Sequence, residues 1–440
     1  MSRIALIGTN SPEFVDKLID IWNGGNCAVL IDPQIPGKVA VNLMREAKVE
    51  ICFIEKEVLR NPSAIKEEEI SFIEYEVSSR SAIHLSENIA SKYIENYSQS
   101  EAVVIYSSGT TGKSKGIILS HYALSTNADA INDCMNLCTD DTIYIARSLT
   151  HLAALTGEML VGLKAHAKIV VAPIIVPPRF ILNNLIKFNV TVLCLSPTLL
   201  SMIVEECGRK HYELSTLNAI YTNGAKLNDK LYIKAQNVLK NIKIYNSYGL
   251  SEAGPRVTSQ TEMCCMTNSV GKPINGVQVH IIDECGNIVE NGGRGIIHVD
   301  TPGRFSGYIS GKEKNPSLFN DWLNTGDIGY FDEYGELHIV DRIDDMIIID
   351  SHKIYPSDVE RQIIKNTSVF DCVVVKRDFD SVDKLCCLYR GNEPLTASKL
   401  TDCLMPYEIP KVYVKVESYP LTNNGKISRE KAKEMFQDQK

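Results

Sequence analysis

Residues 102–116 read Ala102-Val-Val-Ile-Tyr-Ser-Ser-Gly-Thr-Thr-Gly-Lys-Ser-Lys-Gly116, an apolar run followed by a loop rich in glycine, hydroxyl and lysine side chains. The run Ala102–Tyr106 predicts a buried strand, and a helical segment is expected to begin near Ser120. Glycines let backbone N–H groups approach phosphate oxygens closely, while hydroxyls add donors and lysines add positive charge. The stretch therefore predicts a phosphate-binding loop at the end of a strand.

Two other interpretations of this loop remain open. Gly112-Lys113-Ser114 matches the end of a P-loop, but that motif requires a glycine five positions before Gly112, where this chain has Ser107. The mismatch disfavours a P-loop NTPase. A plain surface loop is also disfavoured, because glycines, hydroxyls and lysines are concentrated in so few residues.

Short apolar runs alternate with helix signals on both sides of the loop. One helix signal is Asn10-Ser11-Pro12, which precedes apolar residues at helical spacing and a Gly24-Gly25 stop. Strands separated by helices of this length indicate an α/β fold with parallel sheets covered on both faces. The expected strands are Ile4–Gly8, Cys27–Ile31, Val49–Ile54, Lys168–Val171, Val190–Leu195, Ala219–Thr222 and Ile242–Tyr245.

The pattern changes after residue 268. Between about 268 and 341, short β-type runs are separated by turn sequences such as Asn291-Gly-Gly-Arg-Gly295, which predicts an antiparallel, barrel-like module. The remaining hundred or so residues have mixed α and β character and are enough for a small separate α+β domain. We therefore expect a large domain over residues 1–343, which includes the β-rich part, and a small domain over residues 344–440.

Composition narrows the function classes. The 440 residues include 46 Lys+Arg and 54 Asp+Glu, for a net charge of −8 without a basic run, which disfavours nucleic-acid binding. The longest apolar stretch, Ile169–Pro178, is too short to span a bilayer, and the N-terminus has no signal-peptide pattern. The 13 cysteines contain no CxxC pair and are expected to be free thiols. We predict a cytoplasmic protein without a membrane span.

At this point the chain resembles a known family, the adenylate-forming enzymes, which include acyl- and aryl-CoA synthetases, adenylation domains and luciferases. Their phosphate loop has the form S-S-G-T-T-G-x-P-K-G, and residues 107–116 differ from it only at Ser114. Further family motifs occur in order along the chain. They are Tyr245-Asn-Ser-Tyr-Gly-Leu-Ser-Glu252, Trp322-Leu-Asn-Thr-Gly-Asp-Ile-Gly329, Arg342-Ile-Asp-Asp345 and Asn424-Gly-Lys-Ile427. The resemblance thus covers nearly the whole chain.

The resemblance implies binding of ATP and Mg²⁺. In the phosphate loop, the implied nucleotide-binding residues are Ser107, Ser108, Gly109, Thr110, Thr111, Gly112 and Lys115. Outside it they are Asn246, Tyr248, Gly249, Ser251, Asp327 and Arg342, with a turn-forming role as the alternative for Asn246. Glu252 is the implied Mg²⁺ ligand, because carboxylate and phosphate oxygens suit this hard ion.

The resemblance also assigns the chemistry. Lys426 is implied to neutralise charge between the substrate carboxylate and the α-phosphate, so that Lys426, Glu252 and Arg342 form the catalytic set. Asp344 is the implied hinge about which the small domain rotates between the two half-reactions.

The acid substrate is constrained by two segments. Amino-acid-activating members carry an Asp in the segment that matches residues 147–163, and none is present here, which disfavours an α-amino acid. His151 matches the family's gate position, with ordinary packing as the alternative. Asn223, Gly224 and Ala225 match the loop behind the acyl group, where small residues leave room for an aryl or short aliphatic acid.

The acceptor thiol is less constrained. The resemblance implies coenzyme A or the phosphopantetheine of an acyl or aryl carrier protein. The segment Ile349-Asp-Ser-His-Lys353 lacks the glycine that thioester-forming members carry, so obstruction of the thiol channel is one hypothesis. Alternatives are an enzyme dedicated to a carrier protein and a non-catalytic adenylate-binding subunit.

Overall fold

The structure is a computed structural model, and it describes residues 1–56, 58, 70–108, 114–173, 177–264, 268–289, 292–310, 318–319, 321–349, 352–379, 382–420 and 427–436. The chain divides into two units, which are treated separately below. The first comprises Met1–Val279 and Val299–Leu323, and the second His280–His298 and Asn324–Lys440.

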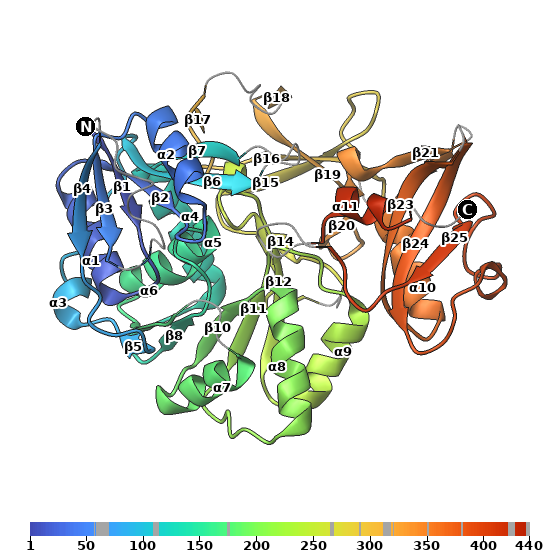
Figure 1. The fold of residues 1–440 in the computed structure, drawn as a ribbon, viewed down its shortest axis with the longest axis horizontal. Coiled ribbons are helices and arrows are strands. Elements are labelled where there is room, and N and C mark those ends of the chain that lie inside the picture. Colours follow the sequence, from blue (N-terminus) through green and yellow to red (C-terminus); the bar gives the residue numbers. More distant parts are fainter. Residues whose placement is uncertain are drawn as a thin grey trace. The chain divides into compact units, whose positions relative to one another are not determined.

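The first unit contains two large, mainly parallel sheets with helices packed on them (Figure 1). In spatial order, the strands of the first sheet are β17 (Gly307–Tyr308), β7 (Ser114–Ser120), β6 (Glu101–Ser108), β2 (Cys27–Ile31), β1 (Arg3–Ile7), β3 (Ile51–Glu55) and β4 (Ser71–Tyr75). Those of the second are β14 (Lys272–Pro273), β13 (Thr258–Ser259), β12 (Lys243–Tyr248), β11 (Ala219–Thr222), β10 (Val192–Leu195), β8 (Thr142–Ile145), β9 (Lys168–Val171) and β5 (Ile83–His84). The predicted α/β fold with parallel sheets is confirmed.

The helices of this unit begin where the sequence provides caps. Ser11 accepts a hydrogen bond from the Phe14 N–H at the start of the first helix, and Ser120 caps the fourth in the same way. The helices are α1 (Pro12–Asn23), α2 (Gly37–Glu46), α3 (Glu87–Ala90), α4 (His121–Met135), α5 (Leu152–Ala154), α6 (Val161–Lys164), α7 (Pro178–Lys187), α8 (Pro197–Arg209) and α9 (Asp229–Val238). A π-helical segment, η2 (Leu155–Leu160), joins α5 to α6, and a 3-10 turn, η3 (Ser251–Ala253), follows β12.

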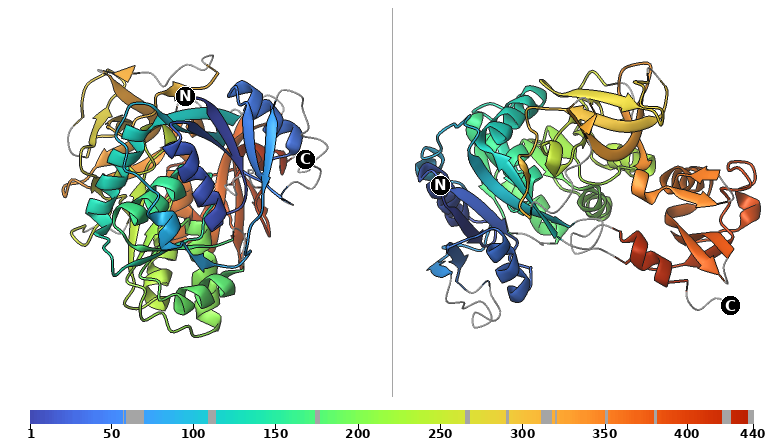
Figure 2. Two further views of the ribbon diagram at one scale, coloured as in Figure 1. Left: turned by 90° about the vertical axis from the view of Figure 1, so that its left-hand side faces the viewer. Right: turned by 90° about the horizontal axis from the view of Figure 1, so that it is seen from above.

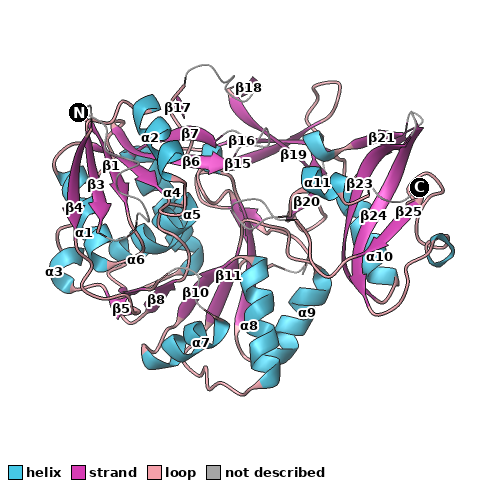
Figure 3. Ribbon diagram, in the orientation of Figure 1, coloured by secondary structure: helices cyan, strands magenta, loops and turns pink. Residues whose placement is uncertain are grey.

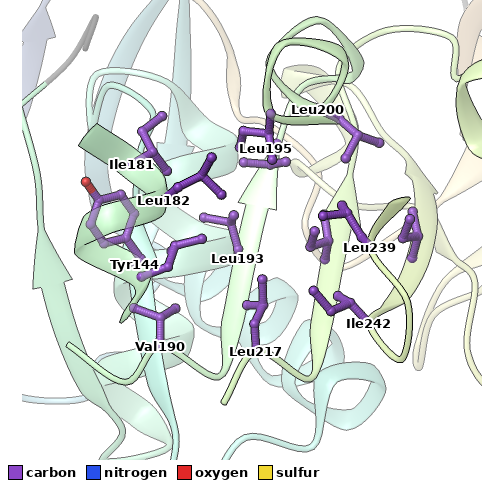
Figure 4. Close-up of a cluster of buried hydrophobic side chains, with 14 of the residues drawn as sticks. Tyr144, Ile181, Leu182, Val190, Leu193, Leu195, Leu200, Leu217, Leu239 and Ile242 are labelled. Atoms are coloured by element: carbon purple, nitrogen blue, oxygen red, sulfur yellow. The ribbon is translucent and has the colours of Figure 1, made fainter. Parts of the chain in front are cut away.

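Two layers of side chains enclose the second sheet. On one face, Leu193 and Leu195 of β10 pack with apolar residues of α7, α8 and α9, as the close-up in Figure 4 shows. The opposite face carries Cys194 and Tyr221, and the Tyr221 hydroxyl reaches the Cys134 carbonyl oxygen of α4 at 3.4 Å. Helix α4 also contacts β6 and β7, so it lies between the two sheets. In Figure 2 the first sheet's N-terminal strands, coloured blue, lie side by side.

The second unit is built mainly from antiparallel strands and helix α10 (Figure 3). Most residues of β15 (Gln278–Ile282), β16 (Gly295–Asp300), β19 (Trp322–Phe331) and β20 (Leu337–Arg342), which belong to a five-stranded sheet, are assigned to this unit. The remaining strand of that sheet, β18 (Leu318–Phe319), is assigned to the first unit. After the 3-10 turn η4 (Ile343–Asp345) come β21 (Ile347–Ile349), β22 (His352–Ile354), α10 (Pro356–Asn366), β23 (Val369–Phe379), β24 (Val382–Gly391), the 3-10 turn η5 (Ala397–Lys399), β25 (Val412–Lys415) and α11 (Arg429–Glu434).

The units differ in extent from the predicted domains. Much of the β-rich segment belongs to the same unit as the C-terminal residues, whereas the sequence prediction places it with the N-terminal domain. That prediction rests on a hinge motif, and a hinge is defined by motion. The boundary between residues 343 and 344 therefore stays a prediction.

Candidate functional site

Several of the predicted site residues follow the carboxyl ends of parallel strands in the second sheet. Asn223 comes directly after β11, and Ser251 and Glu252 come shortly after β12. Arg147, to which the sequence assigned no role, follows β8. In open α/β sheets this edge is where ligands bind, because the loops that leave the strand ends converge there.

The phosphate loop connects two antiparallel strands. Strands β6 and β7 are paired antiparallel. Glu101 lies opposite Ser120 at one end, Ser107 lies opposite Lys115, and Ser108 lies opposite Ser114 next to the loop. A P-loop instead leads from a strand into a helix, so this topology argues against the P-loop NTPase alternative. The predicted nucleotide-binding residues Gly109, Thr110, Thr111 and Gly112 lie outside the described residues.

Gly116 permits a close approach at the base of this hairpin. A Cβ atom there would lie 2.9 Å from Cε1 of Tyr106 and 3.1 Å from Cβ of Ile309. The Gly116 carbonyl accepts a hydrogen bond from the Ile309 N–H at 2.8 Å, next to the short pairing of β17 with β7. The glycine therefore lets the segment that carries Tyr308 lie against the phosphate hairpin.

Tyr308 joins the predicted metal ligand to the phosphate hairpin. Its hydroxyl donates a hydrogen bond to Oε1 of Glu252 at 3.0 Å, and the Nζ atom of Lys115 lies 5.3 Å from its ring centroid. The backbone reinforces this contact, since the Phe305 N–H donates to the Glu252 carbonyl at 3.0 Å. The buried side chain of Tyr308 thus contacts both the carboxylate of Glu252 and the ammonium group of Lys115. This arrangement suits a polyphosphate ligand that carries a metal ion.

The segment between Tyr248 and Glu252 turns tightly. A Cβ atom at Gly249 would lie 2.4 Å from the Pro255 carbonyl oxygen, so only glycine fits there. Tyr248 ends β12, where its carbonyl accepts from the Val257 N–H at 2.7 Å, and Ser251 begins η3. This turn exposes part of the Ser251 and Glu252 side chains at the strand edge.

Asn246 is buried and bonded within the protein. Its Nδ2 atom donates to the Ser269 carbonyl at 3.1 Å, and its Oδ1 atom accepts from the Thr222 hydroxyl at 3.3 Å. These bonds join β12 to β11 and to the loop before β14. Its contact with the adenine base stays a prediction, beside this observed role in the sheet.

The predicted acid-binding residues lie around η2 and the end of β11. His151 is the exposed N-cap residue of α5. Gly224 has a positive φ of 85°, and among the described residues other than its chain neighbours no atom lies within 4 Å of the position of a Cβ; Ala225 is exposed. Asn223 is buried, and its Oδ1 atom accepts a hydrogen bond from Nη1 of Arg147. A π-helical turn at this place is notable, because such turns are frequent at functional sites.

In the second unit, Asp327 and Arg342 face each other across β19 and β20. Nη1 of Arg342 lies 3.2 Å from Oδ1 of Asp327, and its Nη2 lies 3.9 Å from Oδ2 of Asp344. Gly326 has a φ of 72°, and a Cβ there would lie 3.0 Å from Nη2 of Arg342. Asp327 and Arg342, which are predicted to bind the ribose and phosphates of ATP, therefore lie close to Asp344, the predicted hinge residue.

Asp341 directly precedes Arg342 and contacts the start of helix α10. Its Oδ2 atom accepts a hydrogen bond from the Ser357 N–H in the first turn of α10 at 2.8 Å. A carboxylate at a helix N-terminus satisfies a free backbone donor and interacts favourably with the helix dipole. Asp341 therefore fastens α10 to the strand that carries Arg342.

A partly buried ion pair anchors the C-terminal helix α11. Arg429 donates from Nη1 and Nη2 to the two carboxylate oxygens of Glu360, at 2.6 and 3.0 Å, and from Nη1 to the Val374 carbonyl at 2.8 Å. Burial raises the pKa of Glu360, while the guanidinium of Arg429 acts in the opposite direction. Lys426, the predicted catalytic lysine, lies outside the described residues, three positions before Arg429.

Sequence reasoning missed several of these residues. Tyr308 is distant from Glu252 in the chain, and a Gly-Tyr pair before a polar segment carries no clear signal alone. Arg147 stands within the stretch quoted for substrate selection, and Arg429 directly follows the lysine motif. For Arg147 and Arg429, closeness in sequence to a recognised motif was the signal that could have indicated a role in the site. No helix in the described part of the chain is long and apolar enough to cross a membrane.

In a comparison with known protein families, residues 1–309 match the family model described as AMP-binding enzyme. Among curated proteins, the chain is 28% identical over 347 residues to 4-coumarate-CoA ligase 1 from Narcissus pseudonarcissus, a match that covers 74% of this chain and 62% of that protein. It is 24% identical over 468 residues to the fatty acid–[acyl-carrier-protein] ligase ScoC from Streptomyces coeruleorubidus, covering 99% of this chain and 86% of that protein.

The fold is also similar to solved structures. The crystal structure of ATP-bound MatB from Rhodopseudomonas palustris matches 99% of this chain and 89% of that chain, with a TM-score of 0.86 and 21% sequence identity. At this identity the likeness concerns the fold. It agrees with the mixed α/β architecture with large parallel sheets and a separate C-terminal sheet.

Proposed function

Because this chain belongs to the AMP-binding enzyme family, we propose that it activates a carboxylic acid with ATP, forming an acyl-adenylate and releasing pyrophosphate. The acyl group then passes to a thiol of coenzyme A or of a carrier protein. The observation that carries the proposal is the contact of Tyr308 with both Glu252 and Lys115 beside the phosphate hairpin. This contact supports the proposal because Mg²⁺ would require a carboxylate, and the phosphates of ATP would require a cation, close to the phosphate hairpin.

The residues of the first unit fit these ligands. Glu252 supplies the hard carboxylate oxygens that Mg²⁺ prefers, and Lys115 supplies positive charge for the phosphates. Gly249 keeps the backbone after β12 free of a Cβ that would collide with Pro255. Bound Mg²⁺ would neutralise charge on the phosphates as pyrophosphate leaves. The nearby ammonium group of Lys115 would act in the same direction.

In the first half-reaction, one carboxylate oxygen of the acid attacks the α-phosphorus and the bond to the pyrophosphate oxygen breaks. Two anions must approach each other, so the reaction needs cations close to the transferred group. We assign this role to Lys426, with Ser251 as a donor to the α-phosphate. Asp327 accepts hydrogen bonds from the ribose hydroxyls, and Arg342 contacts ribose or phosphate. The Glu360 anchor of Arg429 supports this assignment, because it fixes the chain just after Lys426.

In the second half-reaction, the thiol attacks the acyl carbon and AMP leaves. We propose that the small domain turns about Asp344 between the two reactions, as the hinge motif implies. Both acceptor classes stay in the proposal, since the relatives include a CoA ligase and an acyl-carrier-protein ligase. The glycine-free segment 349–353 bears on this step, and Asp350 and Ser351 within it lie outside the described residues.

We infer that the acid is an aryl or short aliphatic acid and not an α-amino acid. His151, Asn223, Gly224 and Ala225 border its site. The only acidic side chain of segment 147–163, Glu158, bonds to Arg147. Its Oε1 atom is therefore already engaged by a guanidinium, which makes this carboxylate less suited to an α-ammonium group.

The test is carboxylate-dependent exchange of labelled pyrophosphate into ATP, with aryl, short aliphatic, long-chain and amino acids offered separately. We expect exchange with aryl or short aliphatic acids and none without an acid. Exchange with amino acids alone would overturn the substrate assignment. Silence with every acid, while ATP still binds, would favour a non-catalytic adenylate-binding subunit.

A further inference from the structure

A buried ionic cluster lies beside the candidate acid site, and the proposed reaction does not use it. Arg147 donates from Nε to Oε1 of Glu158 at 2.8 Å and from Nη2 to the same oxygen at 2.5 Å. The Glu158 side chain is completely buried, and that of Arg147 is 15% exposed. Arg147 also donates to Asn223, which borders the acid site. The pair is therefore continuous with the residues expected to contact the substrate.

A second guanidinium lies in the same region. Arg256 is 1% exposed, and its guanidinium carbon lies 5.2 Å from the ring centroid of Tyr221. The position of a Cβ at Gly157 in η2 would be 3.9 Å from its Nη2 atom. Arg256 thus lies between the sheet face that carries Tyr221 and the π-helical turn that carries Glu158.

Arg256 is incompletely bonded. Within the described residues, its Nε and Nη1 atoms have no hydrogen-bond partner, and the same holds for Oε2 of Glu158 and for the hydroxyl of Thr156. Buried polar atoms without partners are rare, and a buried charge without one is especially unfavourable. A bound group with acceptor oxygens could supply the partners that Nε and Nη1 of Arg256 lack, whereas Oε2 of Glu158 would need a donor.

The charges around Arg256 leave an excess of positive charge. Among the described groups that interact with Glu158 there are two guanidinium groups, Arg147 and Arg256, for this single carboxylate. Burial raises the pKa of Glu158, while the two guanidinium groups act in the opposite direction. Cys194 also faces Arg256, but burial raises the pKa of this thiol to about 11, which keeps it neutral. An anion would complete the cluster.

The ionic cluster lies at the carboxyl-end edge of the second sheet, where the acid is expected to bind. Arg147 and Asn223 follow the carboxyl ends of β8 and β11, where the acid site is expected. At Gly157, a methyl group would meet only ordinary contacts, with Ile131 at 3.8 Å and Arg256 at 3.9 Å. Gly157 thus brings the backbone of η2, without a side chain, next to the buried guanidinium of Arg256.

We propose that the acid substrate carries a second carboxylate, which Arg256 binds at the far end of the acid site from the reacting carboxylate. This inference rests on the proposed function and narrows it to dicarboxylic acids of aryl or short aliphatic type. Arg147 and Glu158 act as positioning residues, since their pair holds Asn223 and orients η2. A guanidinium suits this task because its planar donors match the two oxygens of a carboxylate.

The experiment compares matched acids in the pyrophosphate exchange assay. Succinate is paired with its half-amide succinamate and with butyrate, and phthalate isomers are paired with the corresponding toluates. We expect kcat/KM for the preferred dicarboxylate to exceed that of its neutral partner by about 30-fold or more, because a buried guanidinium would otherwise be left unpaired. Equal kcat/KM values within every pair would overturn the inference and leave the proposed function intact.

Variants test the residue assignment. Arg256→Met should remove most of the preference for the second carboxylate, chiefly by raising KM for the dicarboxylate, and Arg256→Lys should restore part of it. Arg209→Gln, an exposed arginine at the end of α8, is the control and should keep the wild-type preference. An unchanged preference in Arg256→Met would contradict the assignment of this residue.

A measurement on the unaltered protein covers the case in which the Arg256 variants do not fold. The preferred dicarboxylate should raise the melting temperature in the presence of ATP more than its monomethyl ester does. An equal shift would overturn the inference. If no acid of any class supports exchange, the proposed function fails, and the dicarboxylate inference fails with it.

Discussion

Replacing Tyr308 with phenylalanine removes one hydroxyl and leaves the ring in place. The hydroxyl donates to the Glu252 carboxylate at 3.0 Å, whereas the ring contacts Lys115 at 5.3 Å and Phe305 edge-on at 5.0 Å. Tyr308→Phe therefore tests the orientation of the metal ligand separately from the contact with the phosphate hairpin. Tyr308→Leu removes both interactions, which makes the two variants a matched pair.

The magnitude follows from the type of bond. A hydrogen bond to a charged group contributes about 1.5–3 kcal/mol, which corresponds to about 10-fold to 150-fold in a rate or binding constant. We expect kcat/KM for Mg²⁺–ATP to fall by that factor in Tyr308→Phe. A cation–π contact adds about 0.5–1 kcal/mol, so Tyr308→Leu should lose a further factor of about two to five.

The assay is pyrophosphate exchange at several Mg²⁺ concentrations, with the exposed Tyr334→Phe as a control. If the hydroxyl orients the metal ligand, raising Mg²⁺ should recover part of the lost activity in Tyr308→Phe. Activity within twofold of wild type at limiting Mg²⁺ would refute the role of this hydrogen bond. If Tyr308→Phe and Tyr308→Leu lower kcat/KM by the same factor, the ring contact with Lys115 has no separate role.

Three further variants probe the C-terminal half of the mechanism. Lys426→Ala should nearly abolish adenylate formation while leaving preformed adenylate usable in thioester synthesis; equal loss of both steps, measured separately, would contradict its role. Arg429→Met leaves the partly buried Glu360 without its guanidinium partner and should destabilise the protein by about 1–3 kcal/mol in denaturant unfolding, whereas adding Glu360→Gln should recover much of that loss; no recovery would argue against the ion pair as the cause. Asp350→Gly should leave exchange unchanged and, if its side chain obstructs the thiol channel, increase thioester formation; an unchanged thioester rate would dismiss the obstruction.

Local signals were sufficient for the α/β part of the fold. Ser11 and Pro12 predict the start of α1 because a hydroxyl cap and a fixed proline φ act within a single turn. The strands Cys27–Ile31 and Ala219–Thr222 have the same bounds in the structure, since a buried parallel strand is a continuous apolar run between turns. These features depend on neighbours in sequence.

The remaining features depend on contacts between distant segments. Strand β7 follows the phosphate loop, but its pairing with β6 is set by register across the hairpin and was not predicted. The Glu252–Tyr308 contact joins residues 56 positions apart, and no local pattern indicates it. Arg256 appears in the sequence as an ordinary charged residue before a strand. Its burial follows from the packing of α4 and η2 on the second sheet, which composition and spacing do not encode.

The central claim is that a carboxylate oxygen attacks the α-phosphorus of ATP. It is tested most directly by supplying the preferred acid labelled with ¹⁸O in its carboxylate and analysing the nucleotide by mass spectrometry after thioester formation. One labelled oxygen should appear in AMP, because the bond formed in the first step remains with phosphorus when the thiol attacks the acyl carbon. Unlabelled AMP, or ADP as the nucleotide product, would contradict the account.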